Sequence, residues 1–269
     1  MEKTTSADGT TIAYDAWGDS PGGPTVVIVG GAFNDRNTWA DLAQALAEQG
    51  LRGVSYDRRG RGDSGDTRPY AVEREFEDLR AVIDAVSPGT PVFAHGVSSG
   101  GGLLLRAVDA GVPVARVAVF EPPYRIEGAP PPPENYVGTL QSYVDRDDRA
   151  GLVEYFQTQV IGLPAQMVAS FKGTPMWQGL EAIAPTLVYD AHAMGGEDQS
   201  LPAGTLGRIG VPVLGVTSEG TAVPWMSRTV EVVAGAVPDG RWVRLPGGFH
   251  QVEPAVLAPA LAAFHRGES

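Results

Sequence analysis

The sequence contains no cysteine, two lysines, four histidines and no long run of apolar residues. The absence of cysteine excludes disulfides, thiol nucleophiles and thiolate metal sites, and the four histidines show no metal-ligand spacing. No stretch approaches the ~20 apolar residues that a membrane helix needs, and the N-terminus has no basic segment followed by an apolar one. We therefore expect a cytoplasmic protein that uses neither a metal nor another cofactor.

Acidic residues outnumber basic ones by 32 to 20, which gives a formal net charge of −12 at pH 7. Nucleic acids and anionic membranes bind basic surfaces, so the composition argues against both as partners. With 269 residues, 43% of them hydrophobic, the chain is long enough for one large α/β domain with an inserted segment. The expected partner is a small-molecule substrate, and the sequence leaves the oligomeric state open.

Short apolar runs alternate with helix-like segments along most of the chain. A hairpin is predicted from 3–7 and 11–17, followed by buried strands at 25–29, 52–56, 91–94, 114–120, 211–216 and 242–245. Helices are predicted at 39–49, 72–86, 101–110, 225–236 and 254–265, and further ones at 136–146, 149–160, 165–171 and 178–193. This alternation predicts an α/β fold with a mostly parallel central sheet and helices on both faces. We expect residues 122–205, which show helix patterns and no buried strand, to be a helical cap or lid inserted into a core domain formed by 1–121 and 206–269.

The most informative short pattern is Gly96-Val97-Ser98-Ser99-Gly100, which stands between the apolar run 91–94 and the helix pattern 101–110. A strand that turns at once into a helix forces its apex residue into a strained conformation, and glycines two positions away avoid the resulting clashes. The pattern is that of a nucleophile elbow with Ser98 at the apex. The amide of Ser99 would then point to where negative charge develops during attack on a carbonyl. The sequence therefore predicts an enzyme with a serine nucleophile.

His250 is the predicted general base for Ser98. It lies in a glycine-rich loop between the last predicted strand and the last predicted helix, and it follows the serine in the chain. His95 falls in the strand before the elbow, whereas His192 and His265 fall in predicted helices. We therefore expect these three histidines to have no part in the chemistry.

These motifs, in this order, make the sequence similar to the α/β-hydrolase superfamily over nearly its full length. Gly30-Gly31-Ala32-Phe33 resembles the family's oxyanion loop, which implies that the amide of Ala32 joins that of Ser99 in an oxyanion hole. The segment 57–64 resembles a family loop that shapes the site without taking part in the chemistry. The same region contains a G-x-G-x-x-G pattern, but Pro69 interrupts the helix that would receive a pyrophosphate, so a dinucleotide site is disfavoured.

The acid that would orient His250 has two candidates. Glu219 follows the strand before His250, where the family most often has its acid. Glu121 ends the strand after the elbow, where haloalkane dehalogenases of the same fold include members with a glutamate. Because Pro122 and Pro123 confine the backbone there, we favour Glu121 as the third member of a catalytic triad and keep Glu219 as the alternative.

A serine nucleophile with two backbone donors suits the hydrolysis of an ester, thioester or lactone through an acyl-enzyme. Halide displacement and epoxide opening need a carboxylate nucleophile, which Ser98 excludes. The alternatives are a lyase, acyltransferase or cyclase of a natural-product pathway that uses the same Ser-His site, and a non-catalytic protein that binds small molecules. Large apolar residues on predicted loops and on the cap are the expected walls of the substrate pocket: Phe33, Tyr124, Trp177, Met194 and Trp225.

Overall fold

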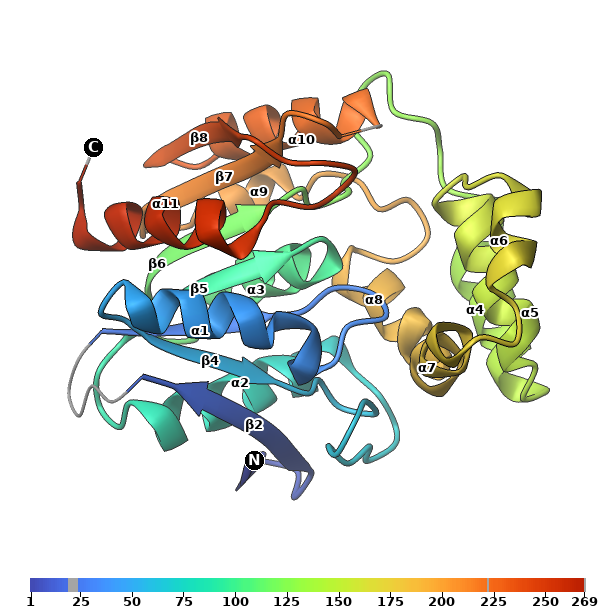
Figure 1. Cartoon of the computed structure of the whole chain (residues 1–269), viewed down its shortest axis with the longest axis horizontal. Coiled ribbons are helices and arrows are strands. Elements are labelled where there is room, and N and C mark those ends of the chain that lie inside the picture. The colour runs from blue at the N-terminus through green and yellow to red at the C-terminus, as the bar shows by residue number, and fades with distance from the viewer. Residues whose placement is uncertain (19–23, 222, 269) are drawn as a thin grey trace.

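The computed structural model describes residues 1–18, 24–221 and 223–268, and one sheet runs through the centre of the molecule (Figure 1). Its strands are β1 (Glu2–Thr5), β2 (Thr11–Trp17), β3 (Thr25–Val29), β4 (Arg52–Tyr56), β5 (Val92–Val97), β6 (Val114–Phe120), β7 (Val213–Ser218) and β8 (Gly240–Leu245). They lie in the order β1-β2-β4-β3-β5-β6-β7-β8. Strands β3 to β8 pair in parallel, and the β1–β2 and β2–β4 pairs are antiparallel. The prediction of a mostly parallel sheet is confirmed.

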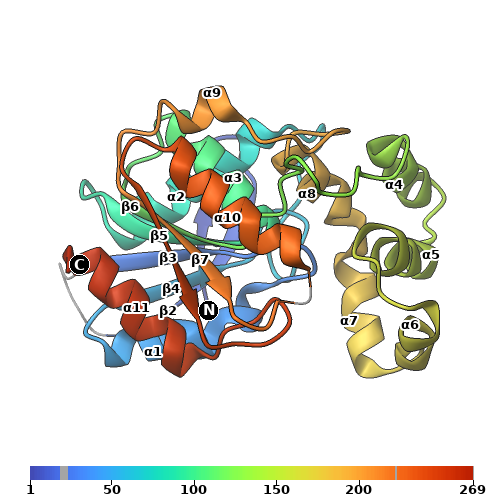
Figure 2. The ribbon, with the colours of Figure 1, turned by 90° about the horizontal axis from the view of Figure 1, so that it is seen from above.

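Helices cover both faces of this sheet, as Figure 2 shows. One face carries α1 (Ala40–Glu48) and α11 (Pro254–Arg266), and the other carries α2 (Val72–Val86), α3 (Ser99–Asp109) and α10 (Pro224–Ala236). In β3, Val27 and Val29 pack into the core on the α2 and α3 side, whereas Val26 and Ile28 pack into the core on the α1 and α11 side. The continuous apolar run thus reflects a strand that is covered on both faces.

A run of helices connects β6 to β7. It comprises α4 (Tyr136–Asp145), α5 (Arg149–Tyr155), the π-helix η2 (Phe156–Val160), α6 (Ala165–Phe171), α7 (Pro175–Ile183), the 3-10 helix η3 (Ala184–Thr186), α8 (Leu187–Ala193) and α9 (Ala203–Leu206). Helices α4 to α7 stand apart from the sheet (Figure 2) around an apolar core of their own, whereas α8 packs against α3. We call the segment from α4 to α8 the helical insertion.

The C-terminal part of the helical insertion differs from the sequence prediction. The single helix predicted at 178–193 is divided into α7, η3 and α8, because Pro185 has no amide hydrogen to continue an α-helix. The proposed division into a core domain and a cap, at residues 121/122 and 205/206, stays a prediction. Within residues 1–18, 24–221 and 223–268, no helix has the length and apolar character to cross a bilayer.

Candidate active site

Ser98 is the turning point between β5 and α3. Its backbone has φ 52° and ψ −126°, and the helix begins at the next residue, Ser99. A Cβ at Gly96 would lie 2.6 Å from the Cα of Gly101, and a Cβ at Gly100 would overlap the carbonyl oxygen of Val29. The local geometry is therefore that of a nucleophile elbow, and both flanking glycines are sterically required.

Glu121 follows β6 directly and is completely buried. Its Oε1 accepts hydrogen bonds from Thr217 Oγ1 (2.9 Å) and from the backbone nitrogen (2.9 Å) and hydroxyl (3.2 Å) of Ser218, at the end of β7. Its Oε2 lies 2.6 Å from Nδ1 of His250. Burial by itself would raise the pKa of Glu121, but the His250 contact and the bonds from Ser218 and Thr217 bring this pKa below its usual value. The carboxylate is thus held in its charged form against the imidazole.

Glu219, the other candidate acid, has a different environment. Its side chain is exposed on the turn after β7, and its backbone nitrogen donates to the carbonyl oxygen of Leu245 at 2.9 Å. Among the described residues, Glu121 provides the carboxylate that contacts His250. The end of β7 therefore contributes donors that fix Glu121 rather than an acid of its own.

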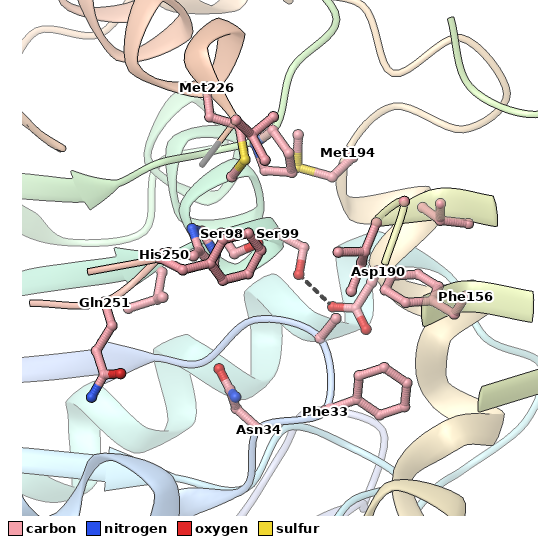
Figure 3. A pocket seen from close by; sticks show the side chains of 18 of the residues that line it. Phe33, Asn34, Ser98, Ser99, Phe156, Asp190, Met194, Met226, His250 and Gln251 are labelled. Carbon is pink, nitrogen blue, oxygen red and sulfur yellow. Dashed lines mark hydrogen bonds between the residues drawn. The ribbon is translucent and has the colours of Figure 1, made fainter. Parts of the chain in front are cut away.

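A cavity of about 730 Å³ opens above the elbow, and Ser98, Ser99, Ala32 and His250 all line it. Figure 3 shows Ser98 and His250 at its wall. Within the described chain no hydrogen bond joins Ser98 Oγ to His250, a bond that often closes only when substrate binds. The predicted nucleophile, base and oxyanion donors are therefore brought to one cavity.

The apolar wall of this cavity comes from both the core and the helical insertion. Of the predicted wall residues, Phe33, Met194 and Trp225 line the cavity. Phe156, which the sequence did not single out, packs edge-to-face on Phe33 with ring centroids 5.4 Å apart. Met226 was also missed and lines the same space (Figure 3).

Two of the predicted wall residues, Tyr124 and Trp177, pack away from the cavity. Tyr124 is 1% exposed and packs in the main core on the α3 side of the sheet. Trp177 packs in the core of the helical insertion, and its Nε1 donates to Oε1 of Glu181 at 2.7 Å. The expectation that these two aromatics line the pocket is wrong, because the ring of each packs in an apolar core.

A buried ion-pair network lies against the elbow. Asp190, in α8, accepts hydrogen bonds from Arg58 (2.6 Å), Arg61 (2.7 Å) and the hydroxyl of Ser99 (2.7 Å; dashed in Figure 3). Arg58 also binds Glu75 through two bonds of 2.7 and 2.8 Å. Burial would raise the pKa of Asp190, but the charges of Arg61 and Arg58 and the Ser99 bond lower it. We call Arg58, Arg61, Glu75, Asp190 and Ser99 the Asp190 network.

The same arginines hold the loop that resembles an oxyanion loop. Arg61 Nη1 donates to the carbonyl oxygens of Gly31 (2.5 Å) and Asn34 (3.1 Å), and Arg58 donates to that of Gly30 (3.3 Å). The charged segment 57–64 was expected to shape the site, and it does so through buried guanidinium groups. Its acidic partner in α8 was missed, because nothing in the sequence marks a carboxylate so distant along the chain.

Unusual backbone conformations gather at this site. Seven described residues other than glycine have positive φ, a region that costs free energy for side-chain-bearing residues. Five of them line the cavity or contact His250: Phe33, Ser98, Glu121, Gln199 and His250 itself. Such concentrated strain is typical of a functional site.

Comparison with known proteins agrees with this fold. An α/β hydrolase of known structure from Sphaerobacter thermophilus is 43% identical, with the match covering 98% of this chain and 100% of that one at a TM-score of 0.89. The chain belongs to the α/β-hydrolase superfamily. The family described as serine aminopeptidase, S33, matches residues 22–147 of the hydrolase.

Curated relatives give a more varied picture. The probable oxidoreductase EphD of Mycobacterium tuberculosis is 41% identical over 95 residues, which is 34% of the hydrolase and 16% of that relative, so the match spans a small part of EphD. A non-heme chloroperoxidase of Streptomyces lividans is 28% identical over 285 residues, covering 98% of this chain and 99% of that one. The predicted fold and the enzyme class, an α/β-hydrolase, are confirmed by these comparisons as a whole.

Proposed function

We propose that this hydrolase cleaves an ester, thioester or lactone of a small, largely apolar molecule through an acyl-enzyme on Ser98. The observation that carries the proposal is the 2.6 Å contact between His250 Nδ1 and the buried carboxylate of Glu121, because His250 lines the same cavity as Ser98. A carboxylate at Nδ1 selects the tautomer in which Nε2 is free to accept a proton. The orienting acid in this mechanism is Glu121.

In the proposed mechanism, each step uses a side chain or backbone amide described above. His250 Nε2 takes the proton of the Ser98 hydroxyl as Oγ attacks the carbonyl carbon, and Glu121 stabilises the resulting imidazolium. The amides of Ala32 and Ser99 donate to the oxyanion. His250 then gives the proton to the departing alcohol or thiol, and a water activated by the same imidazole hydrolyses the acyl-enzyme.

Covalent labelling tests the proposal. A fluorophosphonate probe should modify Ser98 in the wild type and leave Ser98→Ala unlabelled, as read by intact-protein and peptide mass spectrometry. Quenching a reaction with a 4-nitrophenyl ester should trap an acyl group on the same serine. Labelling without a trapped acyl group would favour the lyase alternative, and a wild type that behaves like Ser98→Ala would favour a non-catalytic binding protein.

A further inference from the structure

Arg125 is a charged residue in the wall of the cavity. It lies on the segment that leaves the sheet after Glu121, and it lines the same cavity as Ser98 and His250. Its backbone is held in place, because Arg125 N donates to the carbonyl oxygen of Gln199 at 2.8 Å. A positive charge is thus anchored beside a largely apolar space.

The guanidinium of Arg125 has no carboxylate partner in the part of the chain that the structure describes. Its Nε is buried and makes no hydrogen bond there. The fully buried arginines behave differently, since Arg58, Arg59 and Arg61 each bind at least one aspartate or glutamate. A buried charged donor without an acceptor costs free energy. The chain has a net charge of −12 and many carboxylates that could accept from Arg125, yet none of the described ones does. The acceptor for Arg125 is therefore expected to come from a ligand.

The residues around Arg125 limit the position of its guanidinium and leave the group free to bind such a ligand. The guanidinium carbon lies over the ring of Trp225, 4.7 Å from its centroid, and this cation–π contact limits the positions that the group can take. Asp190, the buried acid in the same cavity, is occupied by Arg58 and Arg61. Burial lowers the pKa of Arg125 from its ordinary value. The guanidinium nonetheless stays charged at neutral pH, because its ordinary pKa is so high.

We propose that Arg125 binds a carboxylate of the substrate, so that the enzyme acts on an ester, thioester or lactone that carries an acid group away from the scissile carbonyl. This inference rests on the function proposed for Ser98. A carboxylate matches the planar fork of a guanidinium with two parallel hydrogen bonds and neutralises its single charge. The apolar part of such a substrate would contact apolar side chains that line the same cavity, among them Phe33 and Phe156.

Kinetics on matched esters test this assignment. Mono-4-nitrophenyl esters of linear diacids from adipic to sebacic acid are compared with analogues in which a primary amide replaces the free carboxylate. For at least one chain length, the wild type should prefer the carboxylate by about 10- to 100-fold in kcat/KM, the range expected for a charged hydrogen-bonded pair. Arg125→Gln should bring this ratio close to one. Arg228→Gln, which removes an exposed arginine of α10, should keep it.

Equilibrium binding separates this inference from the catalytic proposal. In calorimetry, Ser98→Ala should bind the monomethyl ester of at least one of these diacids about 10- to 100-fold more tightly than the matching amide, and Ser98→Ala with Arg125→Gln should lose the difference. If neither nitrophenyl ester is hydrolysed but this binding difference is found, the proposed function fails and the carboxylate site stands. Equal binding of acid and amide at every length, or a preference that survives Arg125→Gln, would overturn the carboxylate site.

Discussion

Ser99 Oγ donates a 2.7 Å hydrogen bond to Oδ1 of Asp190, and this bond joins the first residue of α3 to helix α8 of the helical insertion. Both residues are buried. Asp190 also binds Arg61, which holds the carbonyl oxygen of Gly31 next to Ala32. Asp190 therefore connects, through Ser99 Oγ and through Arg61, the two segments whose backbone amides are proposed to stabilise the oxyanion.

Ser99→Ala tests the contribution of the Ser99 hydroxyl separately from that of the Ser99 backbone amide. The variant loses one buried hydrogen bond, so we expect the free energy of unfolding to fall by about 1 kcal/mol and kcat/KM to fall by no more than about tenfold, because the amide remains. Fluorophosphonate labelling should persist, in contrast to Ser98→Ala. Labelling that is lost in Ser99→Ala and retained in Ser98→Ala would mean that Ser99 is the nucleophile.

Glu121→Gln and Glu219→Gln should differ strongly in rate. In Glu121→Gln one carboxylate oxygen is replaced by an amide NH2 group. The side chain can then no longer accept both from the donors of β7 and from Nδ1 of His250. The value of kcat should fall by up to about 10⁴, as it does in serine proteases when the histidine is held in the wrong tautomer. Glu219 is exposed and does not contact His250 within the described chain, so its variant should keep a rate near that of the wild type. Steady-state kinetics with one activated ester suffices, and equal, mild losses in both variants would argue against either acid.

The fold was predictable because its signals are local. The run Val26 to Val29 alternates between two cores and so must be apolar throughout, which identifies a buried parallel strand without any tertiary information. The same holds for the elbow, where steric demands on Gly96 and Gly100 are set by a strand and a helix adjacent in the chain. The buried position of His95 also follows from the strand that contains it.

The chemistry of the cavity wall was less predictable because it depends on contacts between distant segments. Asp190 binds Arg58 across 132 residues, and neither residue type alone indicates a buried pair. Arg125 has no carboxylate partner among the residues that the structure describes, and this can be recognised only once its neighbours are placed. Similarly, aromatic character alone cannot tell whether a ring faces a cavity, as with Phe156, or a local core, as with Trp177.

Asp190→Asn tests how much the Asp190 network contributes to stability. The substitution leaves Arg58 and Arg61 buried with one negative charge fewer, and removing one partner of a buried ion pair typically costs about 3–5 kcal/mol. We expect a loss of that size in the free energy of unfolding measured with urea. Asp109→Asn is the matched control, because its partner Arg208 is exposed and such surface pairs contribute little. A similarly small effect in both variants would show that the network does not stabilise the fold.

Two buried histidines should make the protein less stable in mild acid. His95 and His265 lie in the core, and no nitrogen of either ring has a hydrogen-bond partner among the described residues. Burial lowers the pKa of His95 to about 4 and that of His265 to about 3. The unfolded chain takes up protons near pH 6.5, which the folded protein cannot do until the pH is much lower. Stability is therefore unaffected by these groups above about pH 6.5 and falls as the pH drops below it.

His265→Phe should reduce this loss. The ring of His265 stacks on Phe93 with centroids 4.5 Å apart, an arrangement that a phenyl ring can keep. One histidine costs about 1.4 kcal/mol per pH unit well below its unfolded pKa, so urea unfolding at pH 7 and pH 5 should show the variant losing about 2 kcal/mol less than the wild type. Aspartates and glutamates titrate alike in both proteins, so their contribution to the pH dependence cancels in this comparison. An identical loss in both proteins would mean that His265 is already protonated in the folded state at pH 5.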